Sequence, residues 1–226
     1  MSRDPIIEIV DLDRYFKNGH KKHYALKSIN LKISRGEFVV LKGVSGSGKT
    51  TLLSIMAGLD RPSKGGVTVE GELLPKLPDA HLSRFRGRHI GMIFQHYNLI
   101  ETLTVRENVL TPLVPMGIDA YEARKRTEAS MDRANILHKA DLQVRYLSGG
   151  EKQRAAIARA IVSEPEIILC DEPTANLDRE NSLKFLDILI EINKGGKTIV
   201  VATHDPIFEE LDIPRTSIEM EDGIIV

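Results

Sequence analysis

The segment at residues 43–50 constrains the fold of this chain more than any other feature of the sequence. It reads Gly-Val-Ser-Gly-Ser-Gly-Lys-Thr, follows the apolar run 38–41 and precedes the largely apolar run 51–57. This order predicts a buried strand, a glycine turn and a helix with an apolar face. Glycine lets successive backbone N–H groups curve around an anion, and a helix N-terminus adds unsatisfied donors. The segment therefore predicts a phosphate-binding loop in an α/β fold.

The lysine and threonine of this loop are expected to contact the most highly charged part of a nucleotide. Lys49 would bridge the β- and γ-phosphates, and the Thr50 hydroxyl would ligate Mg²⁺. The alternative is an ordinary strand–turn–helix, which the full glycine, lysine and threonine pattern disfavours. The predicted ATP-binding residues of the segment are Gly43, Val44, Ser45, Gly46, Ser47, Gly48, Lys49, Thr50 and Thr51.

Two carboxylates follow the apolar run 167–170, at Asp171 and Glu172. A continuous apolar run is typical of a parallel strand covered on both faces. Adjacent like charges at a strand end are costly unless a cation offsets them, so we expect Asp171 to hold Mg²⁺. Glu172 is expected to orient and deprotonate the attacking water. A solvated acidic turn before Pro173 is the alternative, and the phosphate loop in the same chain disfavours it.

Two more polar side chains follow apolar runs. Gln95 comes after the run 90–94 and could reach Mg²⁺ or water, and His204 follows the run 199–202 at a position that suits a γ-phosphate sensor. Ligands of parallel sheets bind at the carboxyl ends of the strands. We therefore predict a catalytic group of Glu172, His204, Gln95 and Lys49, with Mg²⁺ held by Thr50, Gln95 and Asp171.

The segment 148–151 reads Ser-Gly-Gly-Glu, which is a helix capping box. Capping explains Ser148 and Glu151 but not the two glycines at the first helical positions, where glycine weakens a helix. Residues without a side chain at a helix N-terminus allow a phosphate to approach the backbone closely. Because the chain already has its own loop for that purpose, we infer that the nucleotide belongs to a second chain.

The order of these motifs, with 176–178 between the acid pair and His204, resembles the nucleotide-binding subunits of ABC transporters from about residue 6 to 226. The runs 90–95, 98–100, 103–109 and 175–178 look like the lipoprotein-release, macrolide-export and cell-division group. The resemblance implies a RecA-like P-loop NTPase core with a mostly parallel sheet, and a homodimer with two ATP molecules at its interface. The residues that it implies on the partner's ATP are Ser148, Gly149, Gly150, Glu151 and Asp178.

The resemblance also implies a separate integral membrane permease that docks near 95–108. The expected docking surface includes 99–108 with Pro112 and Pro115. The alternative is that this segment only begins a helix, because 104–107 is itself a capping box. By the same resemblance, the aromatic ring that stacks on adenine is Phe16, or alternatively Tyr15 beside it. Cys170 stands where a small residue is usual, and we interpret it as packing. The family most often has Gln at the position of Glu151, and the capping box explains the glutamate in this chain.

Composition and organisation set the remaining expectations. The chain has 226 residues, 42% hydrophobic and 28% charged, with net charge −1, which suits one domain and gives no broad electrostatic reason to bind nucleic acid. We expect a core at about 1–96 and 159–226, including an antiparallel layer over 6–40, and a helical subdomain at about 97–158. The glycine pairs 65–66 and 195–196 are expected to form turns.

The place of the chain in the cell follows from similar arguments. One cysteine fits a reducing compartment, and no apolar run approaches 18 residues, so the chain is expected in the cytoplasm. The resemblance implies that the permease holds it at the inner face of the membrane. The other six histidines are scattered and predict no transition-metal site. The closer resemblance favours an export or mechanotransmission role. The alternatives are an importer subunit, a DNA-repair or ribosome-acting ABC ATPase, and a regulatory module that binds ATP without turnover.

Overall fold

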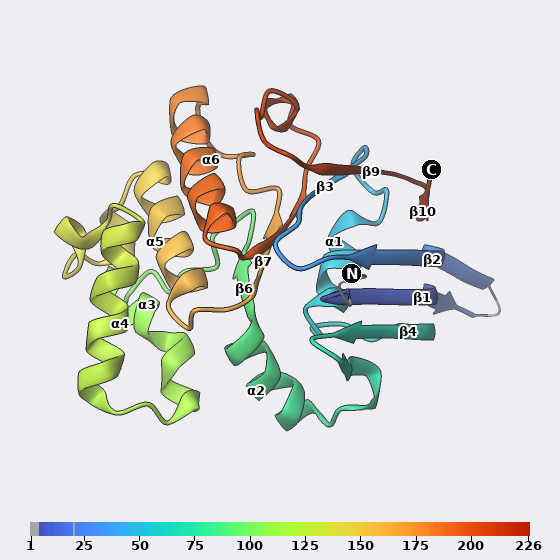
Figure 1. Cartoon of the computed structure of the whole chain (residues 1–226), viewed down its shortest axis with the longest axis horizontal. Coiled ribbons are helices and arrows are strands. Elements are labelled where there is room, and N and C mark those ends of the chain that lie inside the picture. Colours follow the sequence, from blue (N-terminus) through green and yellow to red (C-terminus); the bar gives the residue numbers. More distant parts are fainter. Residues whose placement is uncertain (1–4, 20) are drawn as a thin grey trace.

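Two β-sheets enclose helix α1 (Lys49–Met56) in this computed structural model, which describes residues 5–19 and 21–226 (Figure 1). The first sheet is antiparallel and the second is mostly parallel, and a group of helices packs beyond the second sheet. Both sheets contribute side chains to one apolar cluster around α1. This arrangement is the α/β fold with an N-terminal antiparallel layer that the sequence predicts.

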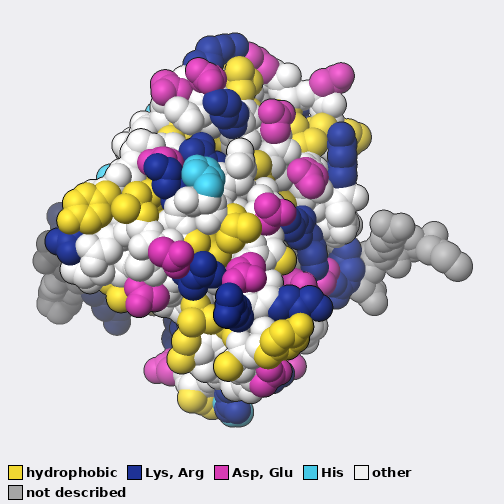
Figure 2. Space-filling model, turned by 90° about the vertical axis from the view of Figure 1, so that its left-hand side faces the viewer, with side chains coloured by type: hydrophobic (Ala, Val, Ile, Leu, Met, Phe, Trp, Pro, Cys, Tyr) yellow, Lys and Arg dark blue, Asp and Glu magenta, His cyan; other side chains and the backbone are white. Residues whose placement is uncertain are grey.

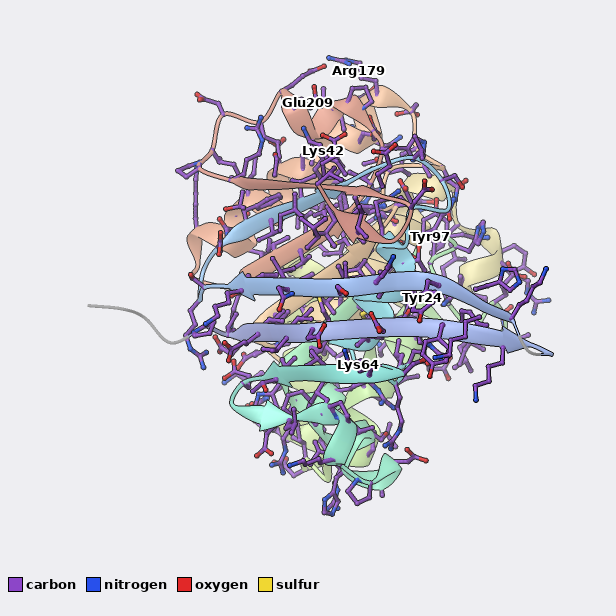
Figure 3. The ribbon with its side chains drawn as sticks, turned by 90° about the vertical axis from the view of Figure 1, so that its right-hand side faces the viewer. Tyr24, Lys42, Lys64, Tyr97, Arg179 and Glu209 are labelled. Atoms are coloured by element: carbon purple, nitrogen blue, oxygen red, sulfur yellow. The ribbon has the colours of Figure 1, made fainter. Side chains whose placement is uncertain are left out.

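The antiparallel sheet has the strand order β2-β1-β4-β5 and faces the viewer in Figure 3, where Tyr24 and Lys64 lie on its strands. Its strands are β1 (Ile7–Asn18), β2 (Lys21–Ile33), β4 (Lys64–Val69) and β5 (Glu72–Leu73). The prediction of a layer over 6–40 is confirmed for β1 and β2. The antiparallel layer extends beyond the predicted limit at residue 40, because β4 and β5 add two strands to this sheet.

The glycine pair at 65–66 does not form the predicted turn but lies inside β4. Gly65 has φ +78°, and a Cβ at this residue would lie 2.2 Å from the Asp11 carbonyl oxygen. The register between β1 and β4 shifts at this point, between Val10 and Asp13. A β-bulge with such a close backbone approach requires glycine, so the sequence signal was a bulge rather than a chain reversal. The pair at 195–196 does follow the end of α6, as predicted.

The second sheet has the order β10-β9-β3-β8-β7-β6, with only β10 antiparallel to its neighbour. Alternate residues of its strands face opposite sides: Val39 packs into the cluster around α1, whereas Val40 and Cys170 pack into the cluster of the helical side. Burial on both faces explains the continuous apolar runs and confirms the packing role of Cys170. The strands are β3 (Phe38–Lys42), β6 (Ile90–Ile93), β7 (Ile167–Asp171), β8 (Thr198–Ala202), β9 (Thr216–Glu221) and β10 (Ile224–Ile225).

The remaining helices lie around the parallel sheet, and those of the 97–158 region pack on one another. Both predicted capping boxes are present, at Thr104 and at Ser148. The signature helix continues past the predicted boundary at 158, and the helix at 79–89 had no prediction. The helices are α2 (Asp79–His89), α3 (Val105–Leu110), α4 (Ala120–Arg133), α5 (Gly149–Ile161) and α6 (Arg179–Lys194). Short 3₁₀ turns are η1 (Leu74–Lys76), η2 (Thr111–Met116), η3 (Leu137–Lys139), η4 (Val144–Tyr146) and η5 (Pro206–Glu209).

The surface of the helical side carries charges of both signs, interspersed with separate apolar groups (Figure 2). Lys and Arg side chains do not form a continuous field on this face. Within residues 5–19 and 21–226, no helix is long and apolar enough to cross a bilayer. The search for groups of three or more His, Cys, Asp or Glu side chains that could hold a metal found none in the same part of the chain.

Candidate functional site

The loop between β3 and α1 has a backbone that only glycine can adopt at its two ends. A Cβ on Gly43 would lie 2.3 Å from the Met220 carbonyl oxygen, and Gly43 has φ +148°. A Cβ on Gly48 would lie 2.6 Å from the Ala25 carbonyl oxygen, and Gly48 has φ +100°. The glycines therefore let the loop pass between neighbouring backbones before α1 begins at Lys49.

A cavity of about 260 Å³ lies over this loop and brings together side chains from distant parts of the sequence. Gln95, Glu172 and His204 line it opposite the loop residues 45–51. These are three of the predicted strand-end groups, and their convergence follows from the shared edge of the parallel sheet. Ala25 of β2 also lines the cavity, which the sequence analysis did not predict.

Lys49 is the buried cation of this cavity, with 5% of its surface exposed. Its ammonium group donates hydrogen bonds to the carbonyl oxygens of Gly43 at 2.6 Å and Val44 at 3.1 Å. The same nitrogen lies 3.6 Å from Oε1 of Glu172. The Ser47 hydroxyl is buried beside it and has no hydrogen-bond partner among the described residues. A buried ammonium and an unpartnered hydroxyl at a helix start fit a polyphosphate.

Thr50 lines the cavity, and its hydroxyl donates a hydrogen bond of 2.9 Å to Oδ1 of Asp171. Burial raises the pKa of the Asp171 carboxyl, and the negative charge of Glu172 raises it further, against the Thr50 hydrogen bond and the Lys49 charge, which lower it. A carboxylate that is costly to ionise in the protein alone is stabilised by a nearby cation. The hydroxyl and carboxylate oxygens are the ligands that Mg²⁺ prefers.

Glu172 has a backbone in the left-handed region, with φ +43°, and its carboxylate is fixed by the chain segment after β8. Oε2 accepts hydrogen bonds from the Thr203 hydroxyl at 3.1 Å and from the His204 backbone N–H at 3.4 Å. Oε1 lies 2.9 Å from Nδ1 of His204. Thr203 is 1% exposed and positions the carboxylate, a role that the sequence analysis missed. Its only signal was a hydroxyl residue between an apolar strand and the predicted sensor.

The signature residues 148–151 lie at the start of α5, and none of them lines the cavity. The Ser148 hydroxyl accepts the Glu151 backbone N–H, and the Ser148 backbone N–H in turn lowers the pKa of the Glu151 carboxyl. A Cβ on Gly150 would lie 2.5 Å from Oδ1 of Asn181, whose amide donates to both carboxylate oxygens of Asp178 at 3.0 Å. Gly150 thus has a packing reason within its own chain, which the sequence argument did not include.

Phe16, the predicted adenine-stacking ring, lies on β1 and is 53% exposed. The Arg14 guanidinium covers one face of this ring at 4.4 Å from its centroid. Tyr15 instead packs against Tyr24, with ring centroids 5.4 Å apart. Neither Phe16 nor Tyr15 lines the cavity, so adenine stacking by Phe16 stays a prediction.

A buried lysine in a glycine loop, a threonine–aspartate pair and a strand-end glutamate define a P-loop nucleoside triphosphatase. A more particular assignment comes from comparison with known proteins, since the ABC transporter family model matches residues 26–175. The chain therefore belongs to the ABC transporter family, and it is an ATP-binding ATPase of that family.

Two relatives extend this similarity over most of the chain. The lipoprotein-releasing system ATP-binding protein LolD of Aquifex aeolicus is 43% identical over 201 residues, which are 89% of each chain. The macrolide export ATP-binding/permease protein MacB of Shewanella sp. (strain ANA-3) is 38% identical over 223 residues, 98% of this chain but 34% of that protein. The resemblance to the lipoprotein-release and macrolide-export group is thereby confirmed.

A solved structure agrees with both the fold and the nucleotide. The ATP-binding cassette MJ0796, in a dimeric post-hydrolysis state bound to ADP and Pi, superposes with a TM-score of 0.88 and is 38% identical. The match covers 97% of this chain and 96% of that one. The predicted fold class is confirmed by this likeness.

Proposed function

We propose that this chain is the energy-coupling subunit of an ABC transporter and works as a pair of copies that close around two MgATP molecules. The observation that carries the proposal is the geometry of Glu172, whose carboxylate is fixed by Thr203 and His204 and lies 3.6 Å from the Lys49 ammonium. A regulatory module that only bound ATP would have no use for a positioned base beside the phosphate site.

Within one chain the loop residues bind the phosphates. The backbone N–H groups at the start of α1 would donate to the phosphate oxygens. The Lys49 ammonium would exchange its hydrogen bonds with two loop carbonyl groups for bonds to the same oxygens. Thr50, Asp171 and Gln95 would hold Mg²⁺, which supplies charge neutralisation of the phosphates when bound. Phe16 would stack on the adenine with the ring face that Arg14 leaves free.

Glu172 would accept a proton from the attacking water at one carboxylate oxygen. Its two oxygens are already oriented by Thr203 and by the backbone and ring of His204, so little reorganisation is needed when the water arrives. His204 is exposed at the edge of the cavity, and there it would sense the γ-phosphate. Hydrolysis would then weaken the closed pair, because the products repel one another.

The second copy would supply the signature residues to each nucleotide. Ser148, Gly149, Gly150 and Glu151 lie at an α5 N-terminus that does not line the chain's own cavity. Its unsatisfied N–H groups and partial positive charge suit the γ-phosphate of a partner. Asp178, which caps α6, would connect the two sites. The dimeric state of MJ0796 with ADP and Pi supports this arrangement.

A membrane permease would receive the motion of the pair, with docking near 95–108. The relatives favour a lipoprotein-release or macrolide-export type, and the MacB relatives are named as ATP-binding and permease proteins in one chain. The chain would thus act at the inner face of the membrane. An importer subunit is the second candidate, because the ATP-site motifs alone do not separate the two directions of transport.

Replacement of Glu172 tests this proposal. Glu172→Gln should lower the ATP hydrolysis rate by about 10²- to 10⁴-fold, the usual contribution of a general base, while ATP still drives dimer formation. The readouts are phosphate release and molar mass by light scattering with and without MgATP. Glu191→Gln, on the exposed face of α6, is the matched control and should hydrolyse ATP at the normal rate. Normal turnover in Glu172→Gln would overturn the assignment of the base.

A further inference from the structure

Glu172 has a backbone conformation that its local sequence disfavours. Its φ of +43° lies in the left-handed region, which residues with a Cβ seldom adopt. Pro173 follows it, and steric contact with a proline drives the preceding residue towards extended conformations. A strained residue of this kind persists only where the surrounding structure fixes it. The contacts that fix Glu172 therefore bear on its function.

Two backbone hydrogen bonds hold Glu172 between β8 and the segment that follows it. Its N–H donates to the Ala202 carbonyl oxygen at 2.8 Å, which joins the residue to the end of β8. Its carbonyl oxygen accepts the Ala175 N–H at 3.3 Å, which closes a turn over Pro173 and Thr174. Both residues inside this turn are buried. The turn is thus packed into the protein, and its hydroxyl group must have a partner there.

The Thr174 hydroxyl finds that partner on the far side of the site. Thr174 is 3% exposed, and its hydroxyl donates a hydrogen bond of 2.6 Å to Oδ2 of Asp205. The bond connects the segment after β7 with the segment after β8. A hydrogen bond to a carboxylate is stronger than one between neutral groups. Thr174 therefore ties the turn that contains Glu172 to a second strand end.

Asp205 has separate partners for its two carboxylate oxygens. Oδ2 accepts the Thr174 hydroxyl, whereas Oδ1 accepts the Ile207 N–H at 3.0 Å and caps η5. The backbone N–H of Asp205 donates to the Thr203 hydroxyl oxygen at 3.0 Å. That hydroxyl in turn donates to Oε2 of Glu172 at 3.1 Å. The cap and the contact with Thr174 can thus be altered separately.

These hydrogen bonds form a closed ring that begins and ends at Glu172. From the carboxylate, the ring passes through the hydroxyl of Thr203 and then through Asp205. It returns through the hydroxyl of Thr174 and along the backbone of the turn. The ring fixes the carboxylate and the backbone of the same residue, and connected hydrogen bonds of this kind strengthen one another.

We propose that the hydrogen bond between Thr174 and Asp205 is a positioning contact for ATP hydrolysis, which keeps Glu172 in the left-handed conformation that directs its carboxylate to the attacking water. The inference rests on the proposed function, in which Glu172 is the base. Thr174 and Asp205 lie outside the set of residues that line the cavity, so they act through Glu172. Without this bond, the turn relaxes towards the extended backbone that Pro173 favours, and the carboxylate moves away from the water.

Thr174→Val in the full chain tests the proposal, because valine keeps the shape of threonine and removes the hydroxyl. The kcat of ATP hydrolysis should fall about 10- to 100-fold, while the KM for ATP stays within about twofold and MgATP still drives dimer formation. Thr174→Ser restores the hydroxyl and should recover most of the lost kcat. An unchanged kcat in Thr174→Val would overturn the inference.

Thr127→Val is the matched control for a general loss of stability. Thr127 lies on α4, is 1% exposed and donates its hydroxyl to the Ala123 carbonyl oxygen at 2.8 Å. Both valine variants therefore lose one buried hydroxyl hydrogen bond. Their melting temperatures should fall by similar amounts, but only Thr174→Val should lose kcat. An equal loss of kcat in both variants would contradict a positioning role.

A double-variant cycle tests whether the two residues act through one bond. Asp205→Ala should also lower kcat, and its combination with Thr174→Val should lower kcat by no more than about threefold beyond Asp205→Ala alone. A double variant whose loss equals the product of the two single losses would show that the residues act independently and would overturn the proposal.

The Glu172→Gln background separates failure of this inference from failure of the proposed function. Thr174→Val should not lower the residual hydrolysis rate of Glu172→Gln further, and a further loss would mean that Thr174 does not act through Glu172. If Glu172→Gln loses turnover but Thr174→Val hydrolyses ATP normally, the positioning contact is wrong and the proposed function stands. Normal turnover in Glu172→Gln would overturn the base itself, and the inference with it.

Discussion

The Thr50 hydroxyl lies 2.9 Å from Oδ1 of Asp171, and this hydrogen bond joins the first turn of α1 to the end of β7. The two residues are remote in sequence, and only the parallel sheet brings the loop helix and the acidic strand end together. The pKa of the Asp171 carboxyl is raised chiefly by burial. The apo chain therefore carries a carboxylate whose negative charge is unfavourable until a cation arrives.

Asp171→Asn should raise the unfolding temperature of the nucleotide-free chain at neutral pH and lower its affinity for Mg²⁺ by at least about tenfold, since even outer partners of a metal contribute that much. Calorimetric melting with and without MgATP measures both effects. A variant that melts lower than the parent chain without nucleotide, yet keeps full stabilisation by MgATP, would contradict the proposed metal site.

The same carboxyl predicts a pH dependence. Below the ordinary aspartate range, near a pKa of about 3.9, the group is protonated in both the folded and the unfolded chain and has no effect on stability. Above that pKa the unfolded chain ionises this carboxyl before the folded chain does, so stability falls until the pH passes the raised pKa of the folded chain and stays lower at neutral pH. The gain in melting temperature of Asp171→Asn should therefore vanish in acid, and a gain that is equal at all pH values would refute this account.

Ser148→Arg should block ATP-driven dimer formation while a single chain still binds ATP, because the long cation would occupy the space of the partner's γ-phosphate. Ser148→Ala is the matched variant that loses only the helix cap, at a cost of about 0.5–2 kcal/mol of stability. Light scattering of these variants in the Glu172→Gln background measures dimerisation. A fluorescent ATP analogue measures nucleotide binding separately. Normal dimerisation of Ser148→Arg would contradict the assignment of residues 148–151 to the partner's ATP site.

Gly91→Ala should lower the free energy of unfolding by about 1–3 kcal/mol, the usual range for overpacking. A Cβ at Gly91 on β6 would lie 2.2 Å from the Ala160 carbonyl oxygen of α5. Gly87 on α2 is the control, since a Cβ there meets nothing within 4 Å, and Gly87→Ala should stabilise the helix by about 0.5–1 kcal/mol. Denaturant unfolding of the two variants should move in opposite directions, and a shift of Gly91→Ala towards higher stability would mean that β6 and α5 are not this close.

Asn108→Ala should destabilise the chain by about 1–3 kcal/mol, because buried backbone groups would lose their partner. The Asn108 side chain is 1% exposed, accepts the Ile100 N–H at 2.7 Å and donates to the Thr104 carbonyl oxygen at 2.9 Å. Glu101→Ala, in the same loop but exposed, should change stability by no more than about 0.5 kcal/mol. Equal midpoints of urea unfolding for both variants would show that Asn108 does not organise this loop.

The accuracy of the sequence predictions depended on the range of the interactions involved. The strand at 38–42, the helix that follows the glycine loop and the capping boxes at Thr104 and Ser148 follow from neighbouring residues, and the structure contains them. The glycine pair at 65–66 misled the prediction because a turn and a β-bulge have the same local signal. Only the partner strand, with its Asp11 carbonyl group, distinguishes them.

The sequence by itself determined the phosphate loop, the apolar strands and the polar residues at their ends, because backbone freedom and hydrophobic pattern act over a few residues. The tertiary structure decided which residues meet: Thr203 at Glu172, Asn181 at Gly150, and Thr50 at Asp171. Such contacts depend on the order of strands in a sheet and on the packing of helices across it. The spacing of residues along the chain does not predict the strand order or the packing of the helices.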